Sequence, residues 1–243
     1  MDRIVRFSMN SDAQRSGEYS LKGDYHKNID ETWHYYPVFL FKMKAIDKFL
    51  EELPKSLKIL DLGCGEGYLV ERYQKLGYNI IGLDLNYLSE FVRKGDIRAT
   101  PFENETFDVV LCLDVIEHLP FSDQNLALKE IYRILKKEGL VLLALPNLAH
   151  FASRVSFLCT GSLIRTSVIE RHPGDRPIIE YLNEIEKNNL TVIKRRGIFP
   201  TFIFTSLLTW YFPQRVIFLH KIINILFAYP NWCFLNLIYC KKK

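Results

Sequence analysis

Between residues 58 and 145, short runs of branched apolar residues alternate with segments of helical periodicity. The apolar runs lie at 58–62, 79–85, 107–113 and 140–145, and the helical patterns lie at 66–76 and 123–137. Strands joined by helices of this length run parallel, because the crossover helix returns the chain to the edge of the sheet where the strand began. The alternation therefore predicts an α/β fold, with a mostly parallel sheet and helices on both of its faces.

The patterns on either side of this core are less regular. Helical spacing of apolar residues predicts a helix over 37–53 that ends before Pro54. Beyond residue 146 we expect further elements: helices at 147–159 and 178–188, and strands at 190–199 and 233–240. The chain is thus expected to have a polar lead-in at 1–36 and a single domain over 37–243.

Composition and charge narrow the choice of function. The net charge of +4 is small and comes mostly from three lysines at the end of the sequence, and no basic stripe with interleaved aromatic residues is present. A nucleic-acid partner is therefore not expected. The five cysteines form no C-x-x-C pair, and the first residues, MDRIVRF, lack the apolar segment of a signal peptide. Reduced thiols and a cytoplasmic location are expected.

The strongest chemical signal is the segment ILDLGCGEG at 59–67. Gly63, Gly65 and Gly67 follow the first strand and open the next helix, where missing Cβ atoms and unpaired N–H groups let a ligand approach the backbone. The spacing differs from the dinucleotide fingerprint G-x-G-x-x-G, whose third glycine would fall at Tyr68. A tight turn without a ligand is the alternative interpretation.

Three segments in order resemble the class I S-adenosylmethionine-dependent methyltransferases. Asp61 and the three glycines resemble the family's motif I, D/E-x-G-x-G-x-G, and Asp84 ends the second strand about 20 residues later. The stretch GDIRATPFENETFDVVLCLDVIEHL at 95–119 is similar to the motifs that follow, and its DVIEHL run resembles the ubiquinone-biosynthesis O-methyltransferases. The resemblance covers 57–145 well and 35–56 loosely. It implies a Rossmann-like, doubly wound sheet of seven strands and S-adenosyl-L-methionine as the cofactor.

The resemblance also assigns the cofactor contacts. Asp84 is expected to accept the ribose hydroxyls through charge-assisted hydrogen bonds, each of which contributes on the order of 1.5–3 kcal/mol. Asp96 and Ile97 are expected to flank the adenine, and Leu113 to lie near the methionine part. The expected cofactor-binding residues are Asp61, Gly63, Gly65, Gly67, Asp84, Leu85, Asp96, Ile97 and Leu113.

Methyl transfer from a sulfonium is an in-line displacement, so much of the catalysis is positioning. A general base helps when the acceptor is a hydroxyl. The candidates for that base are Asp114, His118, His150 and His172, of which Asp114 and His118 are the expected catalytic residues. No metal is expected, because Glu117 and His118 are interpreted as the start of a loop or helix beside the acceptor pocket. A metal site that includes His150 is the alternative.

The C-terminal part is unusually apolar. Residues 197–214 and 222–240 carry no charge, but prolines interrupt both runs and neither clearly reaches the length of a spanning helix. Packed helices, a membrane-touching pair and a spanning segment remain alternatives. We expect an apolar helical insertion over 200–230 that forms a lid beside the acceptor pocket. Arg215 and Lys221 are expected to favour peripheral contact with an anionic membrane.

These observations predict an S-adenosylmethionine-dependent methyltransferase that acts on a small-molecule or lipid-like acceptor, with oxygen as the expected acceptor atom. A protein or nucleic-acid methyltransferase and a non-catalytic cofactor-binding subunit are the alternatives. A nucleobase enzyme of the Asn-Pro-Pro-Tyr type is disfavoured, because the strand at 107–113 continues into Asp114 and Val115 instead.

Overall fold

The computed structural model describes residues 29–165, 167 and 169–243, so most of the expected lead-in at 1–36 lies outside the described residues. Its sheet has seven strands in the order β3-β2-β1-β4-β5-β7-β6. The strands are β1 (Ile59–Leu62), β2 (Ile80–Asp84), β3 (Val92–Lys94), β4 (Phe107–Leu113), β5 (Leu135–Pro146), β6 (Leu190–Pro200) and β7 (Cys233–Lys242). Strands β1 to β5 pair in parallel, and β7 is antiparallel to both of its neighbours. The predicted mostly parallel, seven-stranded α/β sheet is confirmed.

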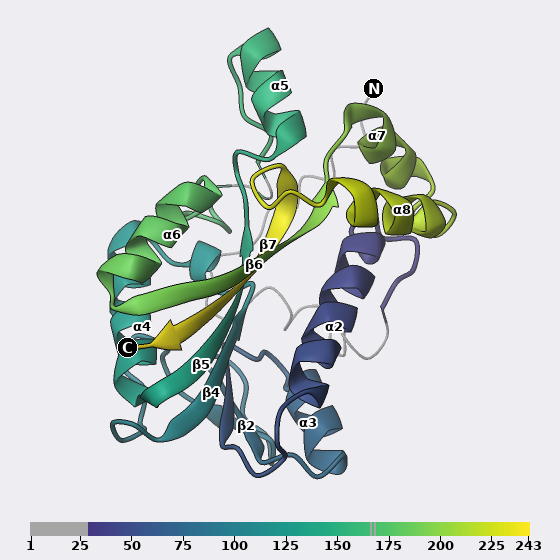
Figure 1. The fold of residues 1–243 in the computed structure, drawn as a ribbon. Coiled ribbons are helices and arrows are strands. Elements are labelled where there is room, and N and C mark those ends of the chain that lie inside the picture. Colours follow the sequence, from purple (N-terminus) through teal and green to yellow (C-terminus); the bar gives the residue numbers. More distant parts are fainter. Residues whose placement is uncertain (1–28, 166, 168) are drawn as a thin grey trace.

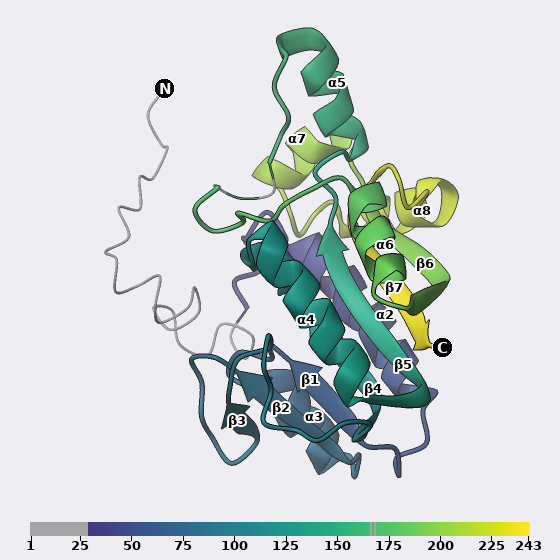
Figure 2. The same ribbon diagram turned by 90° about the vertical axis from the view of Figure 1, so that its left-hand side faces the viewer.

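Helices cover both faces of this sheet, as Figures 1 and 2 show. The covering helices are α2 (Tyr36–Glu51), α3 (Tyr68–Lys75), α4 (Phe121–Ile134) and α6 (Ile178–Lys187). Strand β4 shows how the two layers arise: Val109 and Leu111 belong to the core with α2 and α3, whereas Val110 and Cys112 belong to the core with α4 and α6. Because successive strand residues point to opposite faces, a continuous apolar run fills both cores.

The chain departs from the expected pattern after α4. The helix was expected over 123–137, but it ends at Ile134, and Leu135 already begins β5 and pairs with Phe107 of β4. The N–H of Thr106 donates to the carbonyl of Ile134 at 2.8 Å, so a distant segment takes a carbonyl of the last helical turn. This long-range pairing is invisible to local periodicity, which explains the misplaced boundary.

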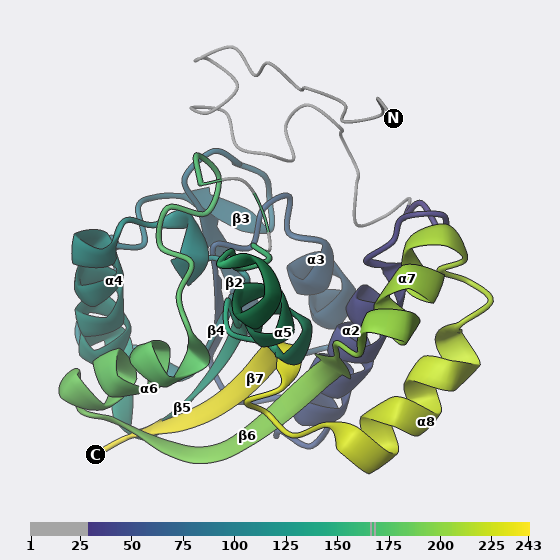
Figure 3. The ribbon, with the colours of Figure 1, turned by 90° about the horizontal axis from the view of Figure 1, so that it is seen from above.

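Three further helices gather at one end of the sheet: α5 (Phe151–Thr160), α7 (Ile203–Tyr211) and α8 (Ile217–Phe227). Figure 3 looks down on this end. Helix α5 follows the carboxyl end of β5, and α7 follows β6, which runs in the same direction because both strands are antiparallel to β7. Strand β1 is parallel to β4 and β5, so its carboxyl end, and with it the glycine loop, lies at the same edge. The apolar insertion and the glycine loop therefore share one end of the molecule.

Candidate active site

A pocket opens at the carboxyl ends of β1 and β4. Its lining comes from three places: the middle of α2, the segment 61–69 and the end of β4. Asp61, Gly63, Gly65, Leu113 and Asp114, all singled out from the sequence, lie in this lining. Open α/β sheets bind ligands outside the carboxyl ends of their strands, so the pocket is where a cofactor is expected.

The three glycines of the loop differ in what surrounds them. A Cβ at Gly63 would lie 2.5 Å from Val115, and one at Gly67 would lie 2.4 Å from Val92, so these two glycines allow close packing within the protein. A Cβ at Gly65 would meet nothing within 4 Å, although its φ of +56° favours glycine. Gly65 is thus the one of the three whose open side a ligand can use.

The carboxylate of Asp84 organises the glycine loop. Its Oδ2 accepts a hydrogen bond of 2.8 Å from the N–H of Gly65, and its Oδ1 accepts one of 2.8 Å from the N–H of Asn86. Oδ1 also accepts a hydrogen bond of 3.3 Å from the N–H of Tyr87. A carboxylate offers about four lone-pair sites, so these three bonds leave about one of them for the expected ribose hydroxyls. The ribose contact itself stays a prediction.

Besides Gly67 and Asp84, three other expected cofactor contacts lie outside the pocket lining. The Asp96 carboxylate is bound by the guanidinium of Arg98, whose hydrogen bonds lower the pKa of Asp96. Arg98 also pairs with Asp123 of α4. Ile97 is buried in the core beside α4, and Leu85 is 53% exposed. None of Leu85, Asp96 and Ile97 lines the pocket in the part of the chain that the structure describes, and their contacts with the cofactor remain predictions.

Asp61 lies at the inner side of the pocket and is buried. Burial raises its pKa to about 7, with a further contribution from the negative charge of Asp84, and the positive charge of Lys42 opposes the shift. The carboxyl group next to the glycine loop therefore titrates near neutral pH.

Lys42 of α2 is a site residue that the sequence interpretation missed. Its Nζ forms an ion pair with Oδ2 of Asp114 across the pocket. Asp114 has a φ of +56°, which is unusual for a residue other than glycine and is often found at functional sites. A signal was present in the sequence: Lys42 falls four residues from both Val38 and Ile46, on the buried stripe of its helix.

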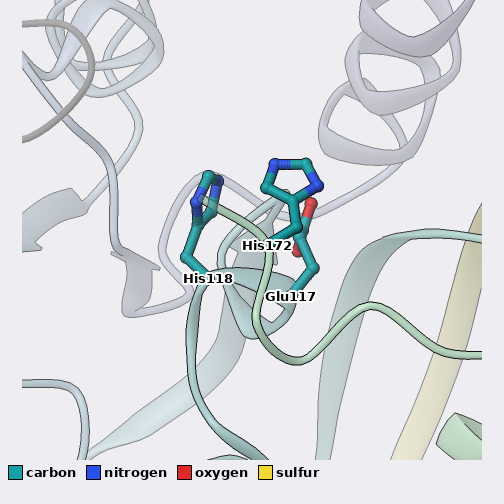
Figure 4. Close-up of side chains that lie close together, drawn as sticks. All are labelled: Glu117, His118 and His172. Carbon is teal, nitrogen blue, oxygen red and sulfur yellow. The ribbon is translucent and has the colours of Figure 1, made fainter. Parts of the chain in front are cut away.

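Next to Asp114, the short helix η1 (Ile116–His118) and the α5–α6 loop bring together Glu117, His118 and His172. Figure 4 shows the Glu117 carboxylate beside the His172 ring, with His118 next to them. The rings of the two histidines lie 4.5 Å apart, and His118 Nδ1 lies 2.9 Å from the carbonyl oxygen of Arg171, to which its N–H donates. Burial, followed by the charge of Asp114, raises the pKa of Glu117 well above its ordinary value. Burial, with a contribution from His118, lowers the pKa of His172 to about 3.

His150 does not join this cluster. Its Nδ1 accepts a hydrogen bond of 3.3 Å from the N–H of Ser153 and lies 2.8 Å from Oγ1 of Thr201, so the ring caps the start of α5. The alternative in which His150 completes a metal site with Glu117 and His118 is therefore wrong. His172 lies beside them instead, because the α5–α6 loop folds back onto η1.

The sequence was compared with known proteins. Residues 60–143 match the family model described as a methyltransferase domain. The ubiquinone biosynthesis O-methyltransferase of Bartonella tribocorum is 31% identical over 159 residues, which are 59% of this chain and 64% of the relative. That of Pelagibacter ubique is 27% identical over 172 residues, which are 65% of this chain and 69% of the relative. These matches support the resemblance to class I S-adenosylmethionine-dependent methyltransferases. The match to the Bartonella relative spans less than two thirds of that protein's length.

A solved structure has the same fold as this chain. It is a Thermotoga maritima protein described as a SAM-dependent methyltransferase and possible histamine N-methyltransferase, with 19% identity and a TM-score of 0.56. The similarity covers 87% of this chain and 100% of that one. The cofactor of such methyltransferases is S-adenosylmethionine, and the residues present fit it: a Cβ at Gly65 would fill open space at the pocket, and the Asp84 carboxylate accepts a hydrogen bond from the same loop.

Proposed function

We propose that this methyltransferase transfers the methyl group of S-adenosylmethionine to an oxygen atom of a small-molecule or lipid-like acceptor. One observation carries the proposal: one pocket joins the glycine loop to Asp114. Glu117 and His118 lie three and four residues further along the chain, outside the pocket lining in the described part. The cofactor cradle and the groups that can receive a proton thus adjoin. S-adenosylmethionine supplies an electrophilic methyl group on a sulfonium when it is bound. The names of the two relatives, ubiquinone biosynthesis O-methyltransferases, support oxygen as the acceptor atom.

His118 and Asp114 have different roles in this proposal. Because His118 donates its Nδ1–H to the carbonyl of Arg171, its Nε2 carries the lone pair that can accept the proton of an acceptor hydroxyl. Asp114 is held by Lys42 at the pocket wall and orients the acceptor. The rest of the catalysis is positioning, supplied by the rigid ends of β1 and β4.

The C-terminal helices α7 and α8 support a lipid-like acceptor. Apolar side chains on them face outward: Phe204 is 71% exposed, Phe218 70% and Ile225 73%. Polar residues are buried between them, with Oγ1 of Thr209 only 2.6 Å from Nε2 of His220. This reverses the usual arrangement, in which a helix buries its apolar face, and exposed apolar patches mark interaction surfaces.

The charges of this region favour an anionic lipid surface as the partner. No aspartate or glutamate follows residue 186, and Arg215 and Lys221 are exposed on the α7–α8 unit. Each cation near an anionic membrane contributes about 1 kcal/mol to the free energy of binding.

Within the described residues, every helix is too short or too polar to cross a bilayer. No residue of 200–230 lines the pocket in the described part. The insertion instead reaches the segment just before α2, where the ring centroids of Trp210 and His34 lie 4.3 Å apart. A lid function for it stays a prediction.

A transfer assay tests the proposal. The purified protein is incubated with methyl-labelled S-adenosylmethionine and with phenols that do or do not carry a long apolar tail, in the presence of anionic vesicles. We expect label in the phenols, more of it with the tail, and a large loss in Asp114→Asn but not in Leu76→Ser, whose leucine is 51% exposed and lies outside the pocket lining. Label found in added protein or RNA would support those acceptor classes instead. Binding of S-adenosylhomocysteine without any transfer would favour a non-catalytic subunit.

A further inference from the structure

The segment after β3 places Asp96 where the far end of the cofactor is expected. Strand β3 is parallel to β2, and Lys94 at its end pairs with Asp84, so the residues that follow lie at the same edge of the sheet as the glycine loop. The N–H of Gly95 donates to the carbonyl of Asp84 at 2.8 Å. A ligand that extends from Gly65 over Asp84 therefore continues toward Asp96.

The carboxylate of Asp96 is occupied by one neighbouring residue, Arg98. Its Oδ1 accepts hydrogen bonds from the backbone N–H of Arg98 at 2.8 Å and from Nε at 3.0 Å. Its Oδ2 accepts from the same Nε at 3.0 Å and from Nη2 at 2.5 Å. Because a carboxylate offers about four lone-pair sites, these contacts compete directly with the amino group of an adenine.

Arg98 has a second acidic partner, Asp123 in the first turn of α4. The Nη1 of Arg98 donates to Oδ2 of Asp123 at 2.5 Å. A guanidinium carries five N–H donors in a planar fork, so it can bind two carboxylates at once. Since Nη1 serves Asp123 while Nε and Nη2 serve Asp96, the guanidinium can leave Asp96 and still keep an ion pair.

The rest of the segment is held without Arg98. The N–H and the hydroxyl of Thr100 donate to Oε1 of Glu130 at 2.7 and 2.6 Å, and these groups are buried. The ion pairs, in contrast, are partly exposed: the side chains of Arg98, Asp96 and Asp123 are 39%, 31% and 23% exposed. Exposed ion pairs contribute little to stability, so Arg98 can exchange partners while Thr100 keeps the segment on α4.

We propose that Arg98 controls the access of the cofactor's adenine to Asp96 and is therefore a specificity-determining residue of the cofactor site. Arg98 and the adenine amino group compete for the same carboxylate, and when the amino group binds Asp96, Arg98 stays paired with Asp123. The competition lowers the affinity for ligands that carry the amino group. The proposal rests on the cofactor of the proposed function but not on its acceptor.

Two substitutions with opposite expected effects test this competition, by calorimetry of the full chain with S-adenosylhomocysteine. Arg98→Ala frees the Asp96 carboxylate and should tighten binding roughly threefold. Asp123→Asn removes the alternative partner of Arg98 and should weaken binding by a similar factor. The control Lys187→Ala removes the same charge from an exposed ion pair with Glu184 on α6 and should bind like the parent. A purely structural role of the ion pairs would weaken binding in both variants.

A ligand without the amino group makes the test specific. The analogue of S-adenosylhomocysteine with purine in place of adenine has no amino group to donate to Asp96, so its Kd should be the same in the parent, Arg98→Ala and Asp123→Asn. Salt provides a measurement on the parent alone. Because salt screens the exposed pair of Arg98 with Asp96, it should tighten the binding of S-adenosylhomocysteine relative to the purine analogue.

Three results would overturn the proposal: weaker or unchanged binding of S-adenosylhomocysteine in folded Arg98→Ala, tighter or unchanged binding in folded Asp123→Asn, or the same changes with both ligands. If the variants do not fold, the parent decides, because equal effects of salt on the two ligands would also overturn it. A protein that shows the expected changes but transfers no methyl group would refute the proposed function alone.

Discussion

Replacing Gly65 by alanine tests whether the glycine loop binds the cofactor. The substitution strains the backbone and adds a methyl group to the pocket, and Gly77 offers a matched control that separates these two effects. Gly65 and Gly77 both have a positive φ, +56° and +85°, and a Cβ at either position meets no atom within 4 Å. Gly65 lines the pocket, whereas Gly77 lies outside its lining, in the turn between α3 and β2. The substitutions Gly65→Ala and Gly77→Ala therefore impose a similar strain but place the new methyl group in different surroundings.

The effect on stability follows from the backbone alone. Alanine in the left-handed region costs about 1–2 kcal/mol, and the reduced flexibility of the unfolded chain offsets about 0.4–1 kcal/mol of this. For a chain of this length, a net cost of about 1 kcal/mol lowers Tm by roughly 2–4 °C. We expect this small decrease in both variants.

The effect on cofactor affinity should appear at Gly65 alone. Forcing a methyl group into a packed contact costs about 1–3 kcal/mol, which corresponds to a five- to 150-fold increase in Kd, roughly. Gly65→Val, with a larger and β-branched side chain, should abolish binding. Isothermal titration calorimetry with S-adenosylhomocysteine measures the affinity, and circular dichroism measures Tm. An unchanged affinity in folded Gly65→Val, or an equal loss in Gly77→Ala, would refute the assignment of the glycine loop.

Other predictions concern pH, the ribose contact and the membrane. Burial raises the pKa of Asp61 from 3.8 to about 7, so the contribution of its protonated form to stability is present below about pH 3.8 and is lost as the pH rises through about 7. Urea unfolding from pH 4 to 8 should show a decrease in the free energy of unfolding of the parent that is missing in Asp61→Asn. The same pH dependence in both proteins would contradict this prediction. Asp84→Ala removes the acceptor of a glycine-loop N–H and should weaken S-adenosylhomocysteine binding by about 1.5–3 kcal/mol in calorimetry; an unchanged Kd places the ribose contact elsewhere. Phe204→Ser combined with Phe218→Ser should reduce flotation of the protein with anionic vesicles, and added salt should also weaken this flotation. The control Leu76→Ser, at a 51% exposed leucine after α3, should float like the parent. Equal flotation of all variants would exclude α7 and α8 as the contact surface.

Within the candidate site, the residues that could be predicted from the sequence belong to two short segments, each with its own local pattern. Asp61, Gly63 and Gly65 belong to one short motif, and Leu113 and Asp114 end a strand whose apolar run is unmistakable. A parallel sheet brings the carboxyl ends of its strands to one edge, so identifying the strands was enough to place these residues together.

His172 was a candidate base, and Lys42 lies on the buried stripe of its helix, but the sequence could not predict the partners of either residue. Lys42 meets Asp114 across 72 positions, and His172 meets Glu117 and His118 only because the loop before α6 is fixed by the buried amide of Gln124. Each contact depends on the path of a distant segment, and neither charge nor periodicity in the sequence specifies that path.

By itself, the sequence determined the α/β alternation, the parallel sheet and the position of the glycine loop, because side-chain periodicity and the steric needs of a tight turn act over a few residues. Only the tertiary structure decided where α4 gives way to β5, which histidine joins Glu117 and His118, and which faces of α7 and α8 remain exposed. These features depend on the burial of one segment by another. A residue such as Phe204 is equally apolar in a core and on a surface, and the rest of the fold determines which of the two it occupies.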